Sequence, residues 1–540
     1  MRALLPAAAL LVALASPGAG QVSTAAGALD AGTQHSVPLD LVEGDFVAGT
    51  LDQGRDEITL ELIAPDGGRV RWFDGPPGVI REFMFAAERS GTHRLRLTAP
   101  LGGGPFPFEL HVSDRIGQDV PSPAAPERPA PLAAPIASLA AKLAAGEAGA
   151  AEAFWREVAA SGTPLVEPLP GGTSRVTFLW RGETARGVEL LSGLRTGDDR
   201  RLVRLAGSDV WYKTIELPAG AHLAYSLVPD APRLAGANRR RAILATAQAD
   251  PLNPRRFPDD PALAGRFDHE SVLSLPGAPP QPETGAAAAG TVTRHRLRSD
   301  LLGNERDIWL YTPAGYAAGR PAPLLVLFDA DRYRRKVGVP AILDRLVADG
   351  LIPPVVAAMV ENPSPEARAS ELPCDPDFAA FLATELLPWI RAQRDIDPDP
   401  DRVALGGASY GGLAAACAAY RHPHLFGAVL AQSGSFWWSP TRVPSERDRY
   451  DPHSEQEWLT RAFVRSPRLP IRFVLQAGLL ELSLAGEGAG ILETTRHLRD
   501  VLEAKGYAVR HREFAGGHDW YAWRAALGPG LIELLGPGRD

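Results

Sequence analysis

The stretch Val403-Ala-Leu-Gly-Gly-Ala-Ser-Tyr-Gly-Gly-Leu-Ala-Ala-Ala416 decides how the second half of the chain folds. Its apolar start predicts a buried strand, and its Ala-rich end predicts a helix. Between them, Gly407-Ala-Ser409-Tyr-Gly411 has the Gly-x-Ser-x-Gly pattern of a nucleophile elbow, a tight turn that exposes a serine hydroxyl. Glycines suit this turn because side chains would meet neighbouring backbone. We therefore predict that Ser409 is a nucleophile, with a purely structural glycine turn as the alternative.

The flanking sequence alternates apolar strands with helices. This alternation predicts a mostly parallel sheet with helices on both faces, as in the α/β-hydrolase fold, over residues 291–540. The predicted strands cover 306–313, 323–328, 354–360, 403–405, 428–431, 471–476 and 509–514. The predicted helices cover 337–348, 376–392, 411–421 and 488–505.

A serine hydroxyl needs a base, and the chain order in this fold is Ser, acid, His. His518 lies in Phe514-Ala-Gly-Gly-His-Asp-Trp, directly after the last predicted strand. The acid is expected after the sixth strand, where Glu481 is the first carboxylate and would orient the imidazole. A Ser–His dyad without an acid remains open. The competing acids are Glu487, Glu493 and Asp519.

An oxyanion hole requires two N–H donors. The residue after the nucleophile supplies one donor, which is the backbone N–H of Tyr410. The second donor is expected in the loop after the strand 323–328, and we assign it to Ala330.

The sequence of the first half of the chain predicts an exported, β-rich extension. Residues 1–20 combine one Arg, an apolar run and small residues, which predicts a secretory signal peptide, with a retained anchor as the alternative. Residues 21–114 carry short alternating strands and predict a β-sandwich that resembles pre-peptidase C-terminal accessory domains. Residues 115–135 form a Pro-rich linker. Residues 136–290 are expected to form one Ala-rich helix over about 136–160 and a second β domain.

Composition excludes some classes of protein. The formal net charge is −8, which argues against a dedicated nucleic-acid binder. After residue 20, no apolar run is long enough for a stable membrane anchor. With a signal peptide, this predicts a periplasmic or secreted protein. The two cysteines, Cys374 and Cys417, fall in separate predicted elements, so we expect free thiols.

Several phrases together resemble the enterochelin (ferric enterobactin) esterase family. The resemblance extends over about residues 150–540, which include both the β domain and the hydrolase domain, and the run from 403 to 438 is the most specific. The phrases are Asp209-Val-Trp-Tyr-Lys-Thr-Ile-Glu-Leu, Ala249-Asp-Pro-Leu-Asn-Pro, Leu324-Leu-Val-Leu-Phe-Asp, Arg368-Ala-Ser-Glu-Leu-Pro-Cys-Asp-Pro-Asp-Phe, Gly407-Ala-Ser-Tyr-Gly-Gly-Leu-Ala-Ala, Arg421-His-Pro-His-Leu-Phe-Gly-Ala-Val-Leu-Ala-Gln-Ser-Gly-Ser-Phe-Trp-Trp and Gly516-Gly-His-Asp-Trp-Tyr-Ala-Trp-Arg. By position, Ser409, His518 and Glu481 match the family's nucleophile, base and post-strand glutamate.

The resemblance implies hydrolysis of the trilactone of a catecholate siderophore. Iron would arrive as part of the substrate, and catalysis itself would need no metal or cofactor. Cations near the cleft suit a triply anionic ferric tris-catecholate, and Trp438 could stack on a catechol ring, although core packing is an equal alternative. The candidate cations are Arg332, Arg334, Arg335, Lys336 and Arg368, with a solvated basic turn as the alternative for residues 332–336.

Two alternatives stay open from the sequence. One is a general carboxylesterase or acyltransferase acting on another small ester. The other is a siderophore-binding protein without catalytic activity. The complete order Ser409, Glu481, His518 argues against it. The oligomeric state is not readable from the sequence.

Overall fold

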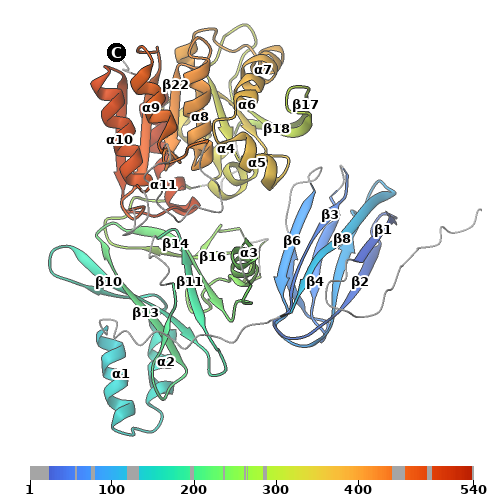
Figure 1. The fold of residues 1–540 in the computed structure, drawn as a ribbon, viewed down its shortest axis with the longest axis vertical. Coiled ribbons are helices and arrows are strands. Elements are labelled where there is room, and N and C mark those ends of the chain that lie inside the picture. The colour runs from blue at the N-terminus through green and yellow to red at the C-terminus, as the bar shows by residue number, and fades with distance from the viewer. Residues whose placement is uncertain are drawn as a thin grey trace, which may run out of the picture.

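The computed structural model describes residues 23–54, 57–73, 80–117, 133–194, 200–234, 237–260, 263, 265–283, 289–440, 456–482 and 489–537. It contains a β-sandwich, a second β domain and an α/β domain (Figure 1). The predicted signal peptide, most of the linker, and Glu487 lie outside the described residues.

The α/β domain is built on one eight-stranded sheet in the order β17-β18-β20-β19-β21-β22-β23-β24. The strands from β20 to β24 in this order pair in parallel, and β17 and β18 add an antiparallel edge. The strands are β17 (Thr291–Ser299), β18 (Asn304–Thr312), β19 (Leu324–Phe328), β20 (Val356–Val360), β21 (Val403–Ala408), β22 (Ala428–Gln432), β23 (Arg472–Gly478) and β24 (Ala508–Phe514). The predicted α/β-hydrolase architecture is confirmed, and β17 is an edge strand that the sequence analysis missed.

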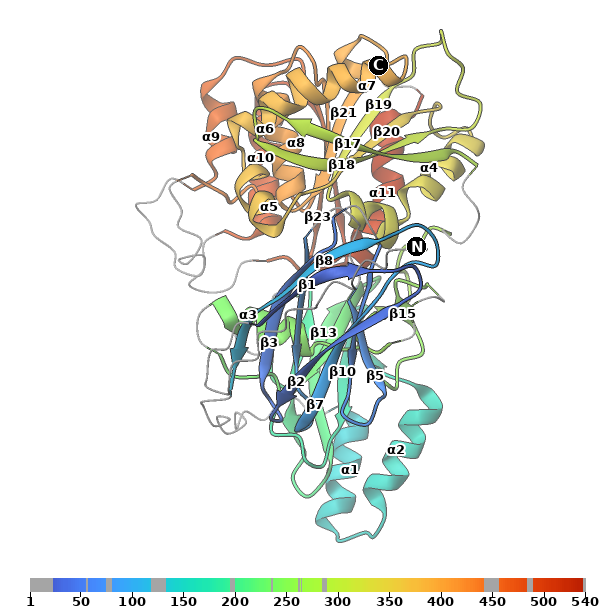
Figure 2. The same ribbon diagram turned by 90° about the vertical axis from the view of Figure 1, so that its right-hand side faces the viewer.

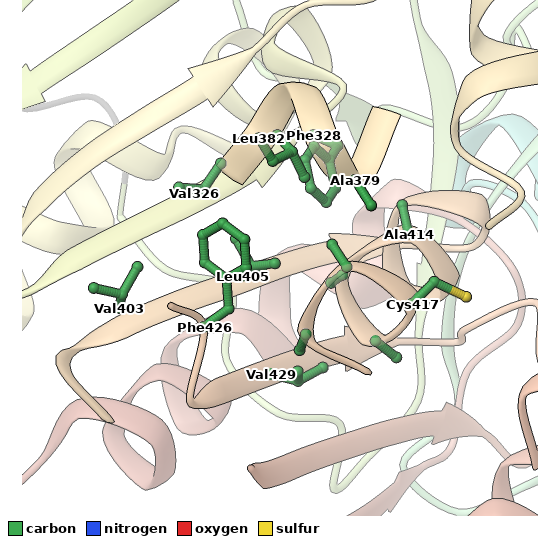
Figure 3. Close-up of a cluster of buried hydrophobic side chains, with 14 of the residues drawn as sticks. Val326, Phe328, Ala379, Leu382, Val403, Leu405, Ala414, Cys417, Phe426 and Val429 are labelled. Atoms are coloured by element: carbon green, nitrogen blue, oxygen red, sulfur yellow. The ribbon is translucent and has the colours of Figure 1, made fainter. Parts of the chain in front are cut away.

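Helices cover both faces of this sheet, because alternate residues of each central strand point to opposite sides. Leu324, Val326 and Phe328 of β19 join the cluster on one face, and Leu325 and Leu327 join the other. The first cluster packs against the nucleophile helix α8 (Figure 3). The helical segments are η1 (Arg332–Val337), α4 (Val339–Ala348), α5 (Pro365–Glu371), α6 (Pro376–Phe381), η2 (Leu382–Leu386), α7 (Leu387–Gln393), η3 (Pro400–Arg402), α8 (Tyr410–Arg421), α9 (Trp458–Arg465), α10 (Ile491–Ala504) and α11 (Trp520–Leu535).

The second β domain consists of two four-stranded sheets, β12-β13-β10-β9 and β11-β14-β16-β15. Its strands are β9 (Leu165–Pro168), β10 (Thr173–Arg181), β11 (Val188–Ser192), β12 (Val203–Arg204), β13 (Val210–Pro218), β14 (His222–Pro229), β15 (Arg256–Phe257) and β16 (Glu270–Ser274). The Ala-rich segment before it is two helices, α1 (Ala134–Ala144) and α2 (Ala150–Ser161), so the single helix predicted over 136–160 was wrong. The helix breaks because Gly146 and Gly149 adopt φ of 73° and 75°, outside helical geometry.

The N-terminal β-sandwich packs sheet β1-β8-β3-β6 against sheet β2-β7-β4-β5. Its strands are β1 (Ser23–Leu29), β2 (Gln34–Leu41), β3 (Phe46–Asp52), β4 (Thr59–Ile63), β5 (Arg69–Phe73), β6 (Arg81–Ala86), β7 (Gly91–Thr98) and β8 (Phe106–Ile116). The sandwich docks on helix α3 (Ala237–Thr246), where Phe46 and Ala48 cluster with Ala242 and Ala245.

The three domains occupy different parts of the molecule. The α/β domain occupies one end of the molecule, and helices α1 and α2 extend from the opposite end (Figures 1 and 2). The second β domain lies between them and contacts the N-terminal part of α11. Tyr521 of α11 packs against its Phe257, with ring centroids 5.4 Å apart.

Candidate active site

The turn at Ser409 joins strand β21 to helix α8 and has an unusual backbone. Ser409 has φ 57° and ψ −120°, which few non-glycine residues adopt. Its N–H donates to the Gln432 carbonyl at 2.9 Å, which ties the turn to the neighbouring strand β22. A Cβ on Gly407 would lie 2.5 Å from the carbonyl carbon of Gly411, so the turn closes only around glycine. The sequence prediction of a strained strand–turn–helix is confirmed.

Three predicted side chains meet at the carboxyl edge of the sheet. His518 Nε2 lies 3.1 Å from Ser409 Oγ. The other ring nitrogen, Nδ1, lies 2.5 Å from Oε1 of Glu481. This chain of contacts has the connectivity of a serine, a base and an orienting acid.

Glu481 is held as an acceptor in a fully buried position. Its side chain has 0% exposure. Its Oε2 accepts hydrogen bonds from Ser433 Oγ at 2.7 Å and from the Gly478 N–H at 2.6 Å. Trp523 Nε1 in turn donates to Ser433 Oγ at 2.9 Å, so the hydroxyl is oriented toward the carboxylate. These two donors occupy Oε2 and leave Oε1 for His518.

The other described acids take different positions. Asp519 caps helix α11 by accepting the Ala522 N–H at 2.9 Å, and burial raises the pKa of its carboxyl well above the usual value. Glu493 lies in the first turn of α10. Among the described residues, Glu481 is therefore the carboxylate that the structure places on His518.

The two predicted oxyanion donors lie after neighbouring strands. Tyr410 is the first residue of α8 and directly follows Ser409. Ala330 is fully buried and follows β19, which pairs with β21. The aim of these N–H groups at a reacting carbonyl stays a prediction.

A network of charged and polar side chains fixes the turn around Ala330. Asp329 has φ 61°, and Oδ1 accepts from Asn362 Nδ2 at 2.7 Å and from Arg368 Nε at 2.6 Å. A second Arg368 nitrogen donates to Oδ2 at 2.9 Å, which completes a bidentate pair. On the other side of Ala330, the Asp331 N–H donates to Glu361 Oε2 at 2.6 Å.

Arg368 thus has a protein partner inside the site. Burial lowers the pKa of its guanidinium, but hydrogen bonding to Asp329 and the charge of Asp329 outweigh burial and raise it overall. The guanidinium also lies 5.9 Å from the centre of the Tyr410 ring. The contacts give Arg368 a role in holding the Asp329–Asp331 turn, and its predicted contact with substrate remains untested.

The rest of the Arg368–Cys374 segment is anchored as well. Glu371 forms a buried bidentate pair with Arg306 of β18, with nitrogen–oxygen distances of 2.9 Å. Cys374 is bonded to Cys417 of the nucleophile helix, across a Cα–Cα distance of 5.3 Å. The expectation of two free thiols was wrong, because the segment between α5 and α6 packs beside α8 although the two are separate in sequence.

The predicted cation cluster after Ala330 is largely engaged with other protein groups. Arg334 lies 4.0 Å from the centre of the Trp309 ring and 3.6 Å from Asp331, and Arg335 lies 3.8 Å from Asp331. Lys336 pairs with Glu270 of the second β domain at 2.9 Å. Arg332 is exposed. Substrate contacts for Arg332, Arg334 and Arg335 stay predictions.

Two adjacent tryptophans have different neighbours. Trp438 packs near-perpendicular to Trp458, with ring centroids 6.2 Å apart, so it belongs partly to the core. Trp437 lies 6.1 Å from the ring of Tyr410, which directly follows the nucleophile. Of the two, Trp437 is the ring that the structure places against Tyr410.

Several residues of the site were not singled out from the sequence. They include Ser433, Trp523 and Ser435, whose Oγ lies 3.3 Å from Ser409 Oγ. All three fall inside phrases of the family resemblance, but no spacing rule identified them. Within the described part of the chain, no group of three or more His, Cys, Asp or Glu side chains could hold a metal ion, and no helix could cross a membrane.

Two family models match the chain. A putative esterase model matches residues 299–534, and an enterochelin esterase N-terminal model matches residues 175–284. Together they cover most of the second β domain and of the α/β domain and leave the N-terminal β-sandwich outside.

Full-length relatives extend this similarity. The iron(III) enterobactin esterase of Dickeya dadantii is 32% identical over 441 residues, covering 75% of this chain and 97% of the relative. The iron(III) salmochelin esterase of Escherichia coli O6:H1 is 31% identical and covers 74% of this chain and 98% of the relative. The crystal structure of ferric enterobactin esterase from Salmonella typhimurium has a TM-score of 0.58 at 29% identity, covering 71% of this chain and 98% of that one.

Proposed function

Because the chain belongs to the enterochelin esterase family, we propose that it hydrolyses the trilactone ester bonds of a catecholate siderophore. The relatives that align with this chain over nearly their whole length are enterobactin and salmochelin esterases. A structure of the Shigella flexneri enterobactin esterase in the presence of enterobactin aligns with a TM-score of 0.56 at 29% identity, over 72% of this chain and 98% of that one. The single observation that carries the proposal is the continuous Ser409–His518–Glu481 contact chain.

The first half of the proposed reaction opens the lactone ring. Ser409 Oγ attacks an ester carbonyl while His518 Nε2 takes the hydroxyl proton. The backbone N–H groups of Tyr410 and Ala330 stabilise the oxyanion. The ester C–O bond then breaks, and His518 returns its proton to the departing alkoxide. Because the ester is part of a ring, the opened chain stays attached to Ser409 with no fragment lost.

The second half releases the product. Water attacks the acyl-enzyme carbonyl, and His518 takes the water proton. The bond to Ser409 breaks, the serine hydroxyl regains its proton, and a ring-opened carboxylic acid leaves. Glu481, whose Oε2 accepts two hydrogen bonds, orients and stabilises the imidazolium in both halves.

Ring opening offers a route to iron release. In the closed trilactone, three catechols are held at high effective concentration around one iron ion. Cutting the ring lengthens the tether between the catechols and lowers that concentration. Iron is thus cargo of the substrate in this proposal, and the chemistry is performed by protein groups and water.

Export is the second part of the proposal. The segment 1–20 has the charge, apolar run and small residues of a signal peptide. The Cys374–Cys417 pair supports it, because disulfides persist mainly in oxidising compartments. We therefore place the enzyme in the periplasm or outside the cell. Fractionation of cells that express the full chain, compared with a chain lacking residues 2–20, tests this; equal retention of both in the cytoplasm would contradict export.

A substrate panel tests the proposed activity. Purified protein is mixed with ferric enterobactin, iron-free enterobactin and a simple aryl acetate, and products are followed by liquid chromatography and mass spectrometry. The proposal predicts ring-opened catecholate products and a kcat/KM for the trilactones above that for the aryl acetate. A preference for the aryl acetate would indicate a general carboxylesterase, and binding without turnover would indicate a siderophore-binding protein.

A further inference from the structure

The two loops that carry Glu481 and His518 are embedded in the second β domain. Leu480, the residue before Glu481, packs against the main hydrophobic cluster of that domain. Ala515, at the start of the loop that reaches His518, packs against the same cluster. The acid and base loops of the α/β domain thus share an apolar anchor in a different domain.

Backbone hydrogen bonds reinforce this anchor at both ends of the His518 loop. The His222 N–H of strand β14 donates to the Ala515 carbonyl at 2.9 Å. At the other end, the N–H of His518 itself donates to the Gly193 carbonyl at 2.9 Å. Gly193 directly follows strand β11, so the second β domain contacts the backbone of the proposed base.

This contact is a close approach of two backbones. A Cβ placed on Gly193 would lie 2.5 Å from the His518 nitrogen and 2.8 Å from its carbonyl carbon. In the reverse direction, a Cβ on Gly517 would lie 2.6 Å from the carbonyl carbon and oxygen of Gly193. All of these distances are shorter than a Cβ atom tolerates, and the obstructing atoms are backbone, which cannot rotate away. Any side chain at position 193 must therefore push the two backbones apart.

We propose that Gly193 is a positioning residue for His518, so that the second β domain completes the catalytic geometry of the α/β domain. This inference rests on the proposed function. His518 must reach Ser409 Oγ at 3.1 Å and Glu481 at 2.5 Å simultaneously. A displacement of about 1 Å in such a constellation lowers rates by about 100-fold. The glycine keeps the two backbones at the separation that meets both distances.

The test is Gly193→Ala in the full chain. With the trilactone substrate, kcat falls by about 100-fold while KM stays within about threefold of wild type. The rate at which a small organophosphonate labels Ser409 falls by a similar factor, since labelling needs the Ser–His pair but no siderophore contact. The matched control is Gly528→Ala in α11, where an added Cβ meets no atom within 4 Å.

The outcomes separate positioning from other roles. Unchanged kcat in Gly193→Ala overturns the inference, and so does a raised KM with a normal labelling rate, which would indicate substrate binding. Phosphonate labelling is independent of substrate, so failure of the siderophore proposal leaves this readout intact. If circular dichroism shows that Gly193→Ala does not fold, Leu480→Ala removes the apolar anchor without overpacking. The inference then predicts about tenfold lower kcat and labelling rate, and unchanged values overturn it.

Discussion

The two halves of the proposed catalytic centre are held by different parts of the chain. The nucleophile half consists of Ser409 and the turn at Ala330, and it is fixed by contacts inside the α/β domain. The acid–base half consists of Glu481 and His518, and its loops rest on the second β domain.

The interactions that hold the two halves differ in kind as well as in location. The nucleophile half depends on charged and covalent links between Asp329 and Arg368, between Arg306 and Glu371, and between Cys374 and Cys417. In the acid–base half, hydrogen bonds inside the α/β domain hold Glu481, and apolar packing and backbone hydrogen bonds across a domain boundary hold the two loops. The comparison teaches that an α/β-hydrolase sheet can supply a nucleophile by itself, whereas this chain recruits another domain to place the base.

After removal of the nucleophile itself, the largest expected effect lies in the acid–base half. Glu481→Gln lowers kcat by about 10³–10⁴-fold, because an amide neither fixes the imidazole tautomer nor stabilises the imidazolium. Steady-state assays with the trilactone measure it. Glu493→Gln, a change in a nearby acid on α10, serves as the control with wild-type kcat. A Glu481→Gln enzyme with normal kcat would mean that Ser409 and His518 act as a dyad.

The disulfide tests the covalent link of the nucleophile half. The Cys374→Ala/Cys417→Ala double variant is less stable by about 2–4 kcal/mol, because the bond closes a loop between residues 43 apart in sequence. Urea unfolding under non-reducing conditions measures this. Each single variant should lose the same amount as the double variant. Equal stability of wild type with and without reductant would show that the bond contributes nothing.

Glu361 adds a pH dependence to the same half. Burial, followed by the charges of Asp331 and Asp329, raises the pKa of Glu361 to about 7. Between about pH 4.5 and 7 the folded chain holds a proton that the unfolded chain has released, so stability falls as pH rises across this window. In Glu361→Gln, the decrease in the free energy of unfolding across this pH window is smaller by about 3 kcal/mol. Urea unfolding at pH 5 and pH 8 measures it, with exposed Glu503→Gln as the control, and identical slopes in wild type and Glu361→Gln would contradict it.

A substitution of Arg368 distinguishes two roles for its guanidinium, which are support of the turn at Ala330 and contact with substrate. Arg368→Gln breaks the bidentate pair with Asp329 and loosens the turn at Ala330, so kcat falls by about 10–30-fold with KM nearly unchanged. Arg391→Gln on the exposed side of α7 is the matched control. A raised KM with normal kcat would instead support the substrate contact predicted from the sequence.

Local patterns in the sequence were sufficient to predict the strand–turn–helix at Ser409. The elbow at Ser409 is visible because strand, turn and helix are contiguous, and chain order alone then pointed to Glu481 and His518. The break between α1 and α2 was missed although it has a local signal, since Gly146 and Gly149 lie inside an otherwise strong helical stretch.

Contacts between distant segments could not be predicted in this way. Cys374 and Cys417 meet because two elements pack on one face of the sheet, which the sequence order does not reveal. The Asp329 partner of Arg368 and the contact of Gly193 with His518 join segments far apart in the chain. Gly193 directly follows a strand, so the sequence indicates only an ordinary turn there and does not reveal its contact with His518.

Trilactone hydrolysis by the Ser409→Ala variant tests the central claim most directly. Product formation from ferric and iron-free enterobactin is measured by liquid chromatography and mass spectrometry for wild type, the variant and buffer alone, with circular dichroism to verify folding. The account predicts that kcat falls by at least about 10⁴-fold in the folded variant. Hydrolysis at the wild-type rate would contradict a mechanism that runs through Ser409.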